Sequence, residues 1–412
     1  MGIITNIRKF GLEYCDLPTM VWNVGLMLRV VTLNVDPRHK KRSPIVLYIT
    51  TIISASLYYY SYFFSALWFV FVTSRAEKDM ISAMVVISLC LCGLIGPIKL
   101  IFLIFKRKEI KNLVAKYLEL NSVITPASRF QQNLLKRMRS VKKRVIFFWI
   151  MLTVNGLIYF IRPLFFPGRR SLEENFPIYG LEPRLESPYY EVSYIIGVIS
   201  TIYMLHLTIH VTGLLLTLSG YTESQMLALA EEFRELWIDA EIHYQEITAS
   251  RASTADNSQN IIKNNYIRTQ LHSMIKIHTA NIEIWRQIEI AFRGALAAEF
   301  VLLIFSLIAE LLGGLKNTYI QIPYGFALVG MDCLAGQRVS DASVAFEKAV
   351  YESKWENFNA ENMKIIWMII LNSQKPLQLS AGGLANLNLS ILMTIARSVY
   401  SAYTAFSSHV SR

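Results

Sequence analysis

Long apolar stretches separated by short charged segments dominate this chain. About 20 apolar residues let a helix cross about 30 Å of hydrocarbon, where every backbone group must be satisfied within its own helix. Four stretches meet this requirement with at most one charged residue each, namely 45–72, 80–105, 145–166 and 192–218. Three further stretches are shorter or more polar, namely 294–315, 318–335 and 384–406. The pattern predicts an all-α polytopic membrane protein with seven transmembrane helices.

The distribution of Lys and Arg predicts the orientation, because short basic segments stay in the cytoplasm. Residues 106–144 contain twelve Lys or Arg and two Glu, whereas residues 167–191 contain three Arg and five Glu. The segment before the first span also ends in a basic run, 38–42. We therefore expect residues 1–44 to form a cytoplasmic N-terminal segment. After seven crossings the C-terminus lies outside, which inverts the chain relative to G-protein-coupled receptors.

Residues 219–293 have the pattern of helices and not of a flexible linker. Seven Lys or Arg stand against ten Asp or Glu here, but long loops follow the charge rule weakly, so the number of crossings assigns the segment to the cytoplasm. Leu227, Phe233 and Trp237 recur at helical spacing, and a second apolar series runs from Ile261 to Ile288. We expect the fourth and fifth spans to continue as cytoplasmic helices. Amphipathic helices of this kind need a partner, such as another subunit.

Composition supports the membrane class and excludes others. Hydrophobic residues make up 53% of the chain and charged residues 17%, with a mean hydropathy of +0.36. The net charge of +11 follows from the basic flanks of the spans, and no Lys/Arg cluster is interleaved with aromatic residues, so we expect no nucleic-acid partner. The sequence lacks a Ser/His/Asp set and a phosphate-binding Gly-rich loop, and it has no metal-ligand spacing apart from the pair His206 and His210. We therefore expect neither an enzyme nor a cofactor or metal.

Several polar residues interrupt the apolar stretches. His206 and His210 have the i, i+4 spacing of a two-histidine metal site, but no Glu or Cys accompanies them, which favours hydrogen bonding between helices. Four charged residues are costly at membrane depth and would ordinarily indicate function. They are Arg162, Glu299, Glu310 and Asp332. All four lie near ends of predicted spans, so shifted boundaries that place them in water explain them equally well.

An ordered series of short motifs occupies the C-terminal third. In sequence order it comprises Cys333-Leu334-Ala335-Gly336, Ser343, Ala349-Val350-Tyr351 with Trp355, Gln374-Lys375-Pro376, Ala381-Gly382-Gly383 and Ser401-Ala402-Tyr403-Thr404. This series resembles the insect odorant receptor family, with two departures. The family's terminal Tyr-Phe pair is Ala402-Tyr403 here, and residues 294–335 are short for two full spans. Related gustatory receptors end in a Thr-Tyr motif followed by Gln-Phe, which this chain lacks. The inner loop is shorter than that of the family's co-receptor, which indicates a ligand-tuning subunit.

The resemblance implies an odorant-gated, non-selective cation channel subunit for olfactory signal transduction. It implies a hetero-oligomer, a tetramer with the odorant receptor co-receptor, in contact with membrane lipid in the plasma membrane of an olfactory neuron dendrite. Residues 45–335 would then hold helices one to six and the site for a small volatile hydrophobic ligand, and residues 336–412 an anchor segment and the pore-lining seventh helix. A gustatory-receptor-like chemosensory channel and a small polytopic transporter remain alternatives, although repeated halves, which many transporters have, are not apparent.

The resemblance also places the ligand between helices in the outer half of the membrane. An apolar ligand needs a largely aromatic and aliphatic cavity with few polar groups. Candidate contacts at that predicted depth are Met84, Ser88, Asn155, Tyr159, Tyr194, Val198, Thr201, Ile202 and Tyr324. Ordinary helix packing is the alternative for each. Tyr159 and Tyr194 lead the series, because a tyrosine combines ring area with one hydroxyl.

A polar stripe marks the last apolar stretch. Its members recur at intervals of three or four residues and are Ser390, Thr394, Arg397, Ser401, Thr404 and Ser408. Hydroxyl groups on such a stripe either join helices or face water. The resemblance favours pore lining, with Ser398, Ser401, Ala402, Ala405 and Ser408 as candidates. It also aligns Ala405 with a branched apolar gate residue of the co-receptor.

Overall fold

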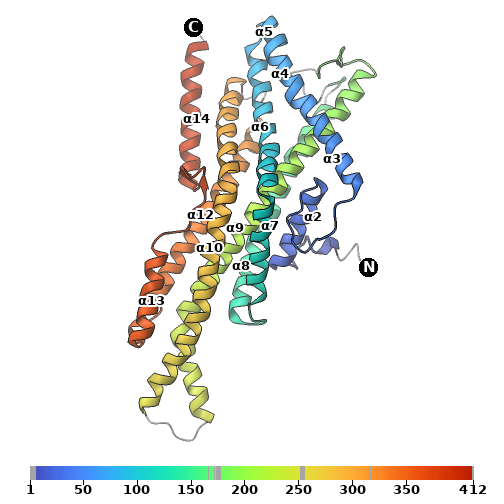
Figure 1. Ribbon diagram of the computed structural model, residues 1–412. Helices are drawn as coiled ribbons and strands as arrows, with labels where there is room; N and C mark the ends of the chain where they lie inside the picture. Colours follow the sequence, from blue (N-terminus) through green and yellow to red (C-terminus); the bar gives the residue numbers. More distant parts are fainter. Residues whose placement is uncertain are drawn as a thin grey trace.

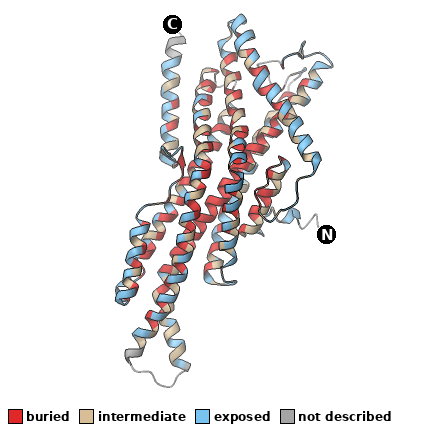
Figure 2. Ribbon diagram, in the orientation of Figure 1, coloured by how far each residue is buried: buried red, intermediate tan, exposed pale blue. Residues whose placement is uncertain are grey.

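The structure, a computed structural model, describes residues 6–165, 167–170, 172, 178–250, 256–314 and 318–410, with the backbone alone for 250, 256–258 and 407–410. It is an elongated bundle of helices with a single two-stranded hairpin among the described residues (Figure 1). The central helices are α6 (Met80–Phe105), α8 (Arg129–Ile161), α9 (Tyr189–Ser250), α10 (Asp256–Leu312) and α12 (Gln321–Tyr351). Buried residues concentrate where these helices pack together (Figure 2).

The first apolar stretch forms a nearly continuous helical run that leans across the bundle (Figure 1). It begins after Pro44, as the sequence predicts, because proline is tolerated at a helix start. The run comprises α3 (Ile45–Tyr58), the π-helical η1 (Tyr59–Ser65), α4 (Ala66–Trp68), the π-helical η2 (Phe69–Thr73) and α5 (Ser74–Glu77). In η1 the side chain of Tyr62 is buried against the bundle.

The expected helical extensions of the fourth and fifth spans are confirmed. α9 has 62 residues and α10 has 57. At 1.5 Å per residue α9 is about 93 Å long, three times the thickness of the hydrocarbon layer. The apolar series predicted in the extension of α9 is buried, with Leu229 at 0% and Phe233 at 1% exposure. The two helices therefore pack against each other well beyond the apolar belt.

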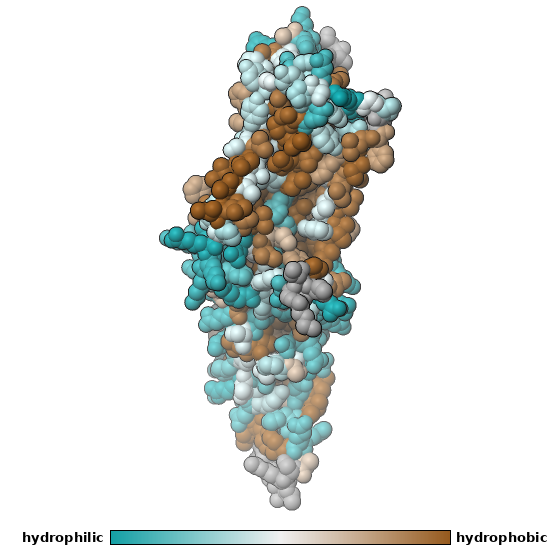
Figure 3. All heavy atoms as spheres, turned by 90° about the vertical axis from the view of Figure 1, so that its right-hand side faces the viewer, coloured by the Kyte–Doolittle hydropathy of each residue, from teal (hydrophilic) through white to brown (hydrophobic). Residues whose placement is uncertain are grey.

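Within the part of the chain that the structure describes, five helices are long and apolar enough to cross a membrane, by length and composition. They are Ile45–Glu77, Met80–Phe105, Arg129–Phe165, Tyr189–Ala249 and Gln259–Leu312. The sixth and seventh predicted spans lie in α12 and α14 (Leu389–Val410). Brown, hydrophobic residues gather in the upper half of the face in Figure 3, between a hydrophilic tip and a mostly hydrophilic lower part. The chain is thus an α-helical membrane protein, and the count of seven crossings and their direction remain predictions.

The boundaries near the C-terminus differ from those expected. The predicted seventh helix began at residue 384, which is wrong, because Leu384 lies in the turn between β1 (Ser380–Ala381) and β2 (Ala385–Asn386). Gly382 and Gly383 adopt φ of 66° and 76°, a left-handed conformation that glycine reaches without steric cost. α14 starts later, where the Asn388 side chain accepts a hydrogen bond from the Ile391 amide at 2.8 Å.

Other elements complete the bundle. α7 (Arg107–Ser122) follows α6, η3 (Arg162–Phe165) follows α8, and η4 (Trp355–Asn357) and α13 (Ala360–Ser373) follow α12. The N-terminal segment contains α2 (Leu17–Val30), which the sequence pattern did not predict, and which packs against α9. α10 ends at Leu312 and α12 continues to Tyr351 without a break, whereas the linker residues 315–317 lie outside the described part.

Candidate functional site

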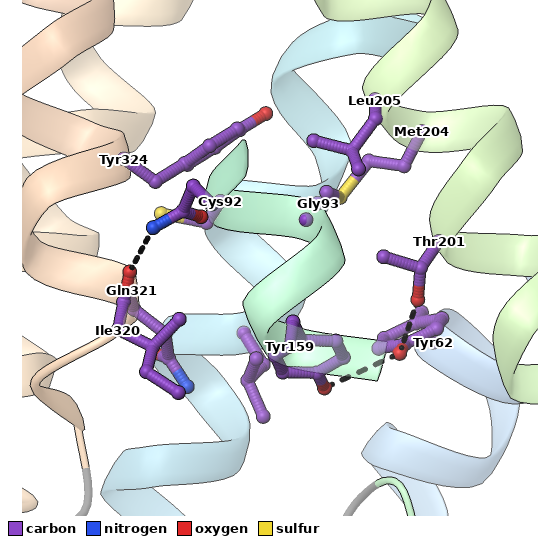
Figure 4. A pocket seen from close by; sticks show the side chains of 13 residues that line it. Tyr62, Cys92, Gly93, Tyr159, Thr201, Met204, Leu205, Ile320, Gln321 and Tyr324 are labelled. Carbon is purple, nitrogen blue, oxygen red and sulfur yellow. Dashed lines mark hydrogen bonds between the residues drawn. The ribbon is translucent and has the colours of Figure 1, made fainter. Parts of the chain in front are cut away.

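A cavity of about 50 Å³ lies where η1, α6, α8, α9 and the start of α12 converge. Side chains from all five elements surround it (Figure 4). The lining residues are Tyr62, Leu89, Cys92, Gly93, Asn155, Gly156, Tyr159, Thr201, Met204, Leu205, Ile320, Gln321 and Tyr324. Apolar and aromatic groups dominate, and a few polar atoms are fixed among them, which is the usual composition of a small-molecule site.

Three hydroxyl groups form one wall of the cavity. The Tyr62 hydroxyl lies 2.9 Å from Thr201 Oγ1 and 3.4 Å from the Tyr159 hydroxyl (Figure 4). Thr201 Oγ1 donates to the carbonyl of Gly197 at 2.9 Å, so its oxygen accepts from Tyr62. The contact between the two tyrosines is the longer one. A ligand oxygen that approached these tyrosines would replace a weak hydrogen bond with a stronger one.

Hydrogen bonds tie the start of α12 to the neighbouring helices around the cavity. The Tyr324 hydroxyl donates to Thr208 Oγ1 on α9 at 3.1 Å, and Asn155 Nδ2 on α8 donates to the Ile320 carbonyl at 3.0 Å. Ser88 Oγ on α6 donates to Gln321 Oε1 at 2.9 Å. Movement of a lining side chain is therefore coupled to the position of α12.

The predicted contact residues divide by their place on the helices. Asn155, Tyr159, Thr201 and Tyr324 line the cavity, and Ser88 contacts the lining residue Gln321. The other four are absent from the lining and are Met84, Tyr194, Val198 and Ile202. The Tyr194 hydroxyl donates to the Phe160 carbonyl at 2.9 Å, and Ile202 is 52% exposed. Met84, Tyr194 and Val198 share a helix face with lining or adjoining residues but lie about one turn or more nearer the helix start, whereas Ile202 lies on another face of α9.

Several lining residues were not predicted, although helical spacing relates them to predicted ones. Cys92 lies four residues after Ser88, Gly156 lies three before Tyr159, and Leu205 lies four after Thr201. Residues three or four apart share a helix face, so each predicted contact had a second one within one turn. Tyr62 had no such signal, because no residue of the first predicted span, 45–72, was among the predicted contacts.

A charged cluster lies inside the bundle below the cavity. The Lys99 ammonium on α6 lies 2.5 Å from Glu299 Oε2 on α10 and 3.1 Å from Asp332 Oδ2 on α12. It also donates to Thr212 Oγ1 on α9 at 2.9 Å. Both carboxylates are 0% exposed. Glu299 and Asp332 are thus buried around a lysine from another helix, and their depth relative to the membrane stays a prediction.

The other two charged residues also have specific surroundings. Glu310 is 0% exposed, and Ser306 Oγ donates to its Oε1 at 3.2 Å beside the cavity residue Cys92. The Arg162 guanidinium lies 5.4 Å from the centre of the Tyr319 ring, a cation–π arrangement. The predicted hydrogen bonding of His206 between helices is confirmed, because its Nε2 lies 3.0 Å from the Met27 carbonyl of α2.

α14 stands beside the bundle and not within it (Figure 1). Its contacts are with α10 and α12, and its outer surface is exposed (Figure 2). Ser398, Ser401 and Ala405 are exposed and Ala402 is half-buried. The side chain of Ser408 lies outside the described part of the structure. The predicted pore residues thus lie together on a helix whose polar stripe faces away from the chain's own core.

This chain is similar to known proteins in sequence and in fold. A family model described as 7tm odorant receptor matches residues 79–400. Odorant receptor 30a of Drosophila melanogaster is 38% identical over 56 residues, which is 14% of this chain and 15% of that receptor. The chain therefore matches only a small part of this curated relative's length.

Solved structures show the same fold. The insect olfactory receptor OR5 of Machilis hrabei superposes with a TM-score of 0.73 over 95% of this chain and 98% of that one, at 14% identity. The structure of OR5 in complex with eugenol gives a TM-score of 0.67 over 94% of this chain and 97% of that one, at 13% identity. Since the family model spans most of the residues, this chain belongs to the 7tm odorant receptor family.

Proposed function

We propose that this chain is a ligand-tuning subunit of an odorant-gated, non-selective cation channel. The observation that carries the proposal is the cavity between η1, α6, α8, α9 and α12, with apolar walls and a line of three hydroxyls. Such a site fits a small volatile hydrophobic molecule with one hydrogen-bonding group. The complex of OR5 with eugenol, a small aromatic molecule, supports the same class of ligand here.

The size of the cavity suggests how the ligand is sensed. Small-molecule sites usually have volumes of about 300–1,000 Å³, whereas this cavity has about 50 Å³. A ligand must therefore displace lining side chains, and Met204 is the most adaptable of them, because methionine has an unbranched, flexible side chain. Because Tyr324 and Asn155 fix the start of α12, expansion of the cavity would move α12 and, through it, α14.

Assembly and location complete the proposal. α14 carries an exposed polar stripe, so we place it at the central pore of a tetramer formed with the odorant receptor co-receptor. Ser398, Ser401, Ala402, Ala405 and Ser408 would line that pore. The subunit would lie in the plasma membrane of an olfactory neuron dendrite, with its N-terminus in the cytoplasm.

Electrical recording tests the proposal directly. The full chain is expressed in cells with the co-receptor, the co-receptor is expressed alone as the control, and currents are recorded during application of a panel of volatile compounds. We expect ligand-dependent cation currents with a compound selectivity that requires this chain. Identical responses in both cell populations, with this chain present at the surface, would reject the tuning role.

The proposed orientation has its own test. An epitope is attached after Arg412, and intact and permeabilised cells are labelled. We expect staining of intact cells, because seven crossings from a cytoplasmic N-terminus leave the C-terminus outside. Staining that appears only after permeabilisation would contradict the proposed orientation.

A further inference from the structure

A second and larger cavity lies on the outer side of the bundle. The N-terminal segment, which includes α2, forms one side of it, and α8 and α9 form the other. Its volume is about 380 Å³. Most of its wall is apolar, and it includes Ile146, Trp149 and Ile150 of α8. Trp149 and Ile150 are 46% and 49% exposed, so this side of the cavity opens to the surroundings of the bundle. The proposed odorant site does not involve any of these residues.

One end of the cavity holds a buried cation without a carboxylate partner. Lys142 is 3% exposed, and its ammonium donates to the carbonyl of Lys9 at 2.8 Å and to that of Tyr14 at 2.5 Å. No ion pair to Lys142 is found among the described residues. A buried charge ordinarily has a partner of opposite sign, since the desolvation cost is otherwise uncompensated.

A hydrogen-bond acceptor next to Lys142 is also unused. Asn23 on α2 is 8% exposed, and its Nδ2 donates to the same Lys9 carbonyl at 2.9 Å. Its Oδ1 is buried without a hydrogen-bond partner in the described structure. The end of the cavity thus presents an ammonium donor and an amide acceptor side by side, and both suit a polar headgroup that carries a phosphate and an O–H or N–H donor.

The position of the cavity along α8 matches the position expected of a lipid-binding site. Lys142 lies three residues before the apolar stretch 145–166, where basic residues flank a membrane span. From Lys142 to Ile150 the helix rises about 12 Å, so the apolar wall runs from the interface into the hydrocarbon layer. Lys143 and Arg139 add positive charge beside Lys142, and the nearby Asp16 already caps α2 by accepting from the Thr19 amide.

We propose that this cavity binds an anionic phospholipid of the leaflet on the side of the N-terminal segment. The phosphate contacts the Lys142 ammonium, a headgroup donor contacts Asn23 Oδ1, and an acyl chain lies along Ile146, Trp149 and Ile150. Such a lipid would join the N-terminal segment to α8 and α9, because Lys142 and Asn23 already share the Lys9 carbonyl.

Photolabelling in vesicles tests the site without reliance on channel currents. The full chain is reconstituted in phosphatidylcholine vesicles that contain a minor fraction of phosphatidylserine with a photoreactive group in one acyl chain. After illumination, peptides are mapped by mass spectrometry. We expect labels on residues 145–150 and on α2, and competition by unlabelled phosphatidylserine but not by added phosphatidylcholine. The labels should fall about five- to tenfold in Lys142→Met, because a basic residue near the surface contributes about 1 kcal/mol and a buried one more.

Two further variants keep the test decisive. Lys143→Met removes an equal charge from an exposed neighbour and should leave labelling nearly unchanged. Ile146→Trp fills the apolar wall while keeping the hydrogen bonds of Lys142, and it should abolish labelling even if Lys142→Met fails to fold. Equal competition by phosphatidylcholine or by a free fatty acid, undiminished labelling of Ile146→Trp, or equal losses in both lysine variants would overturn the proposal.

Discussion

Polar residues occupy two contrasting environments in this molecule. Inside the bundle, Lys99, Glu299 and Asp332 come from three helices and are nearly inaccessible, and the Lys99 ammonium lies within 3.1 Å of both carboxylates. On α14, by contrast, the polar stripe that includes Thr394 and Ser401 is exposed along its described length. In the bundle the Lys99 ammonium offsets buried carboxylate charge from two other helices, whereas Thr394 and Thr404 of the stripe donate to carbonyl groups of α14 itself. This difference supports assigning stability to the charged cluster and assembly to α14.

Packing of α14 leads to the same conclusion. Among its described side chains the buried ones are Ile395 and Val399, which lie one turn apart. One narrow apolar strip thus holds a 22-residue helix against the chain. A helix with so little apolar contact is stabilised further by neighbouring subunits or lipid.

The largest expected effect comes from the charged cluster. Lys99→Met leaves the carboxylates of Glu299 and Asp332 buried without their cation, and removal of one partner from such a group costs about 3–5 kcal/mol. We expect a strong loss of folded protein, measured as the monodisperse fraction in detergent and its thermal unfolding midpoint.

A compensated variant distinguishes charge imbalance from lost packing. Lys99→Met combined with Glu299→Gln and Asp332→Asn removes all three charges and should recover a large part of the lost stability. A single Lys99→Met variant as stable as the wild type would show that the cluster does not hold the helices together.

The second effect concerns the ligand cavity. Tyr159 lines it and contacts Tyr62, whereas the Tyr194 hydroxyl bonds the Phe160 carbonyl outside the lining. Tyr159→Ala should therefore change the rank order of active odorants and shift potency by about tenfold, since ring area and a hydroxyl are lost. Tyr194→Ala serves as the matched control and should shift potency less. Equal potency shifts in the two variants, at equal surface expression, would show that Tyr159 and Tyr194 do not differ in ligand contact.

Sequence alone predicted the helical class and the long extensions, because hydropathy and its 3.6-residue period report directly on burial along a single helix. It did not predict the cluster, since Lys99 and Asp332 are 233 residues apart and meet only after α6 and α12 pack. The split among the predicted contacts has a similar cause. Depth along a helix could be judged from the ends of the spans, but rotation about its axis depends on neighbours, so Thr201 lines the cavity and Ile202 does not.

A smaller effect is expected for the hydroxyl line itself. Thr201→Val keeps the shape of the side chain but leaves the Tyr62 hydroxyl without its 2.9 Å acceptor. A lost hydrogen bond of this kind is worth about 1 kcal/mol, or roughly a fivefold change in potency. Dose–response curves should move for odorants with an oxygen atom and remain in place for hydrocarbon odorants of similar size. Equal movement for both groups would indicate altered packing instead of altered hydrogen bonding.

The smallest effects are expected for substitutions on α14, and they test whether this helix serves assembly and the pore. Under the proposed pore assignment, Ala405 lies at the gate, where hydrophobic groups exclude water by dewetting. Ala405→Val enlarges the apolar constriction and should lower the current, and Ser401→Ala removes an exposed hydroxyl and should shift relative cation permeability modestly. Odorant potency should change much less than with the Tyr159 variant. Stability should also be retained, since both positions are exposed.

Ala396→Val provides a matched control for this last prediction. It lies nine residues before Ala405, which places it on the opposite side of the helix at about 100° per residue, and it is half-buried. The same added methyl groups should therefore leave permeability ratios unaltered there, since they face away from the proposed pore. If Ala405→Val and Ser401→Ala left conductance and permeability at wild-type values, or if Ala396→Val changed them equally, the stripe would be a packing surface between helices. α14 and the charged cluster would then differ in the partners that their polar groups contact and not in function.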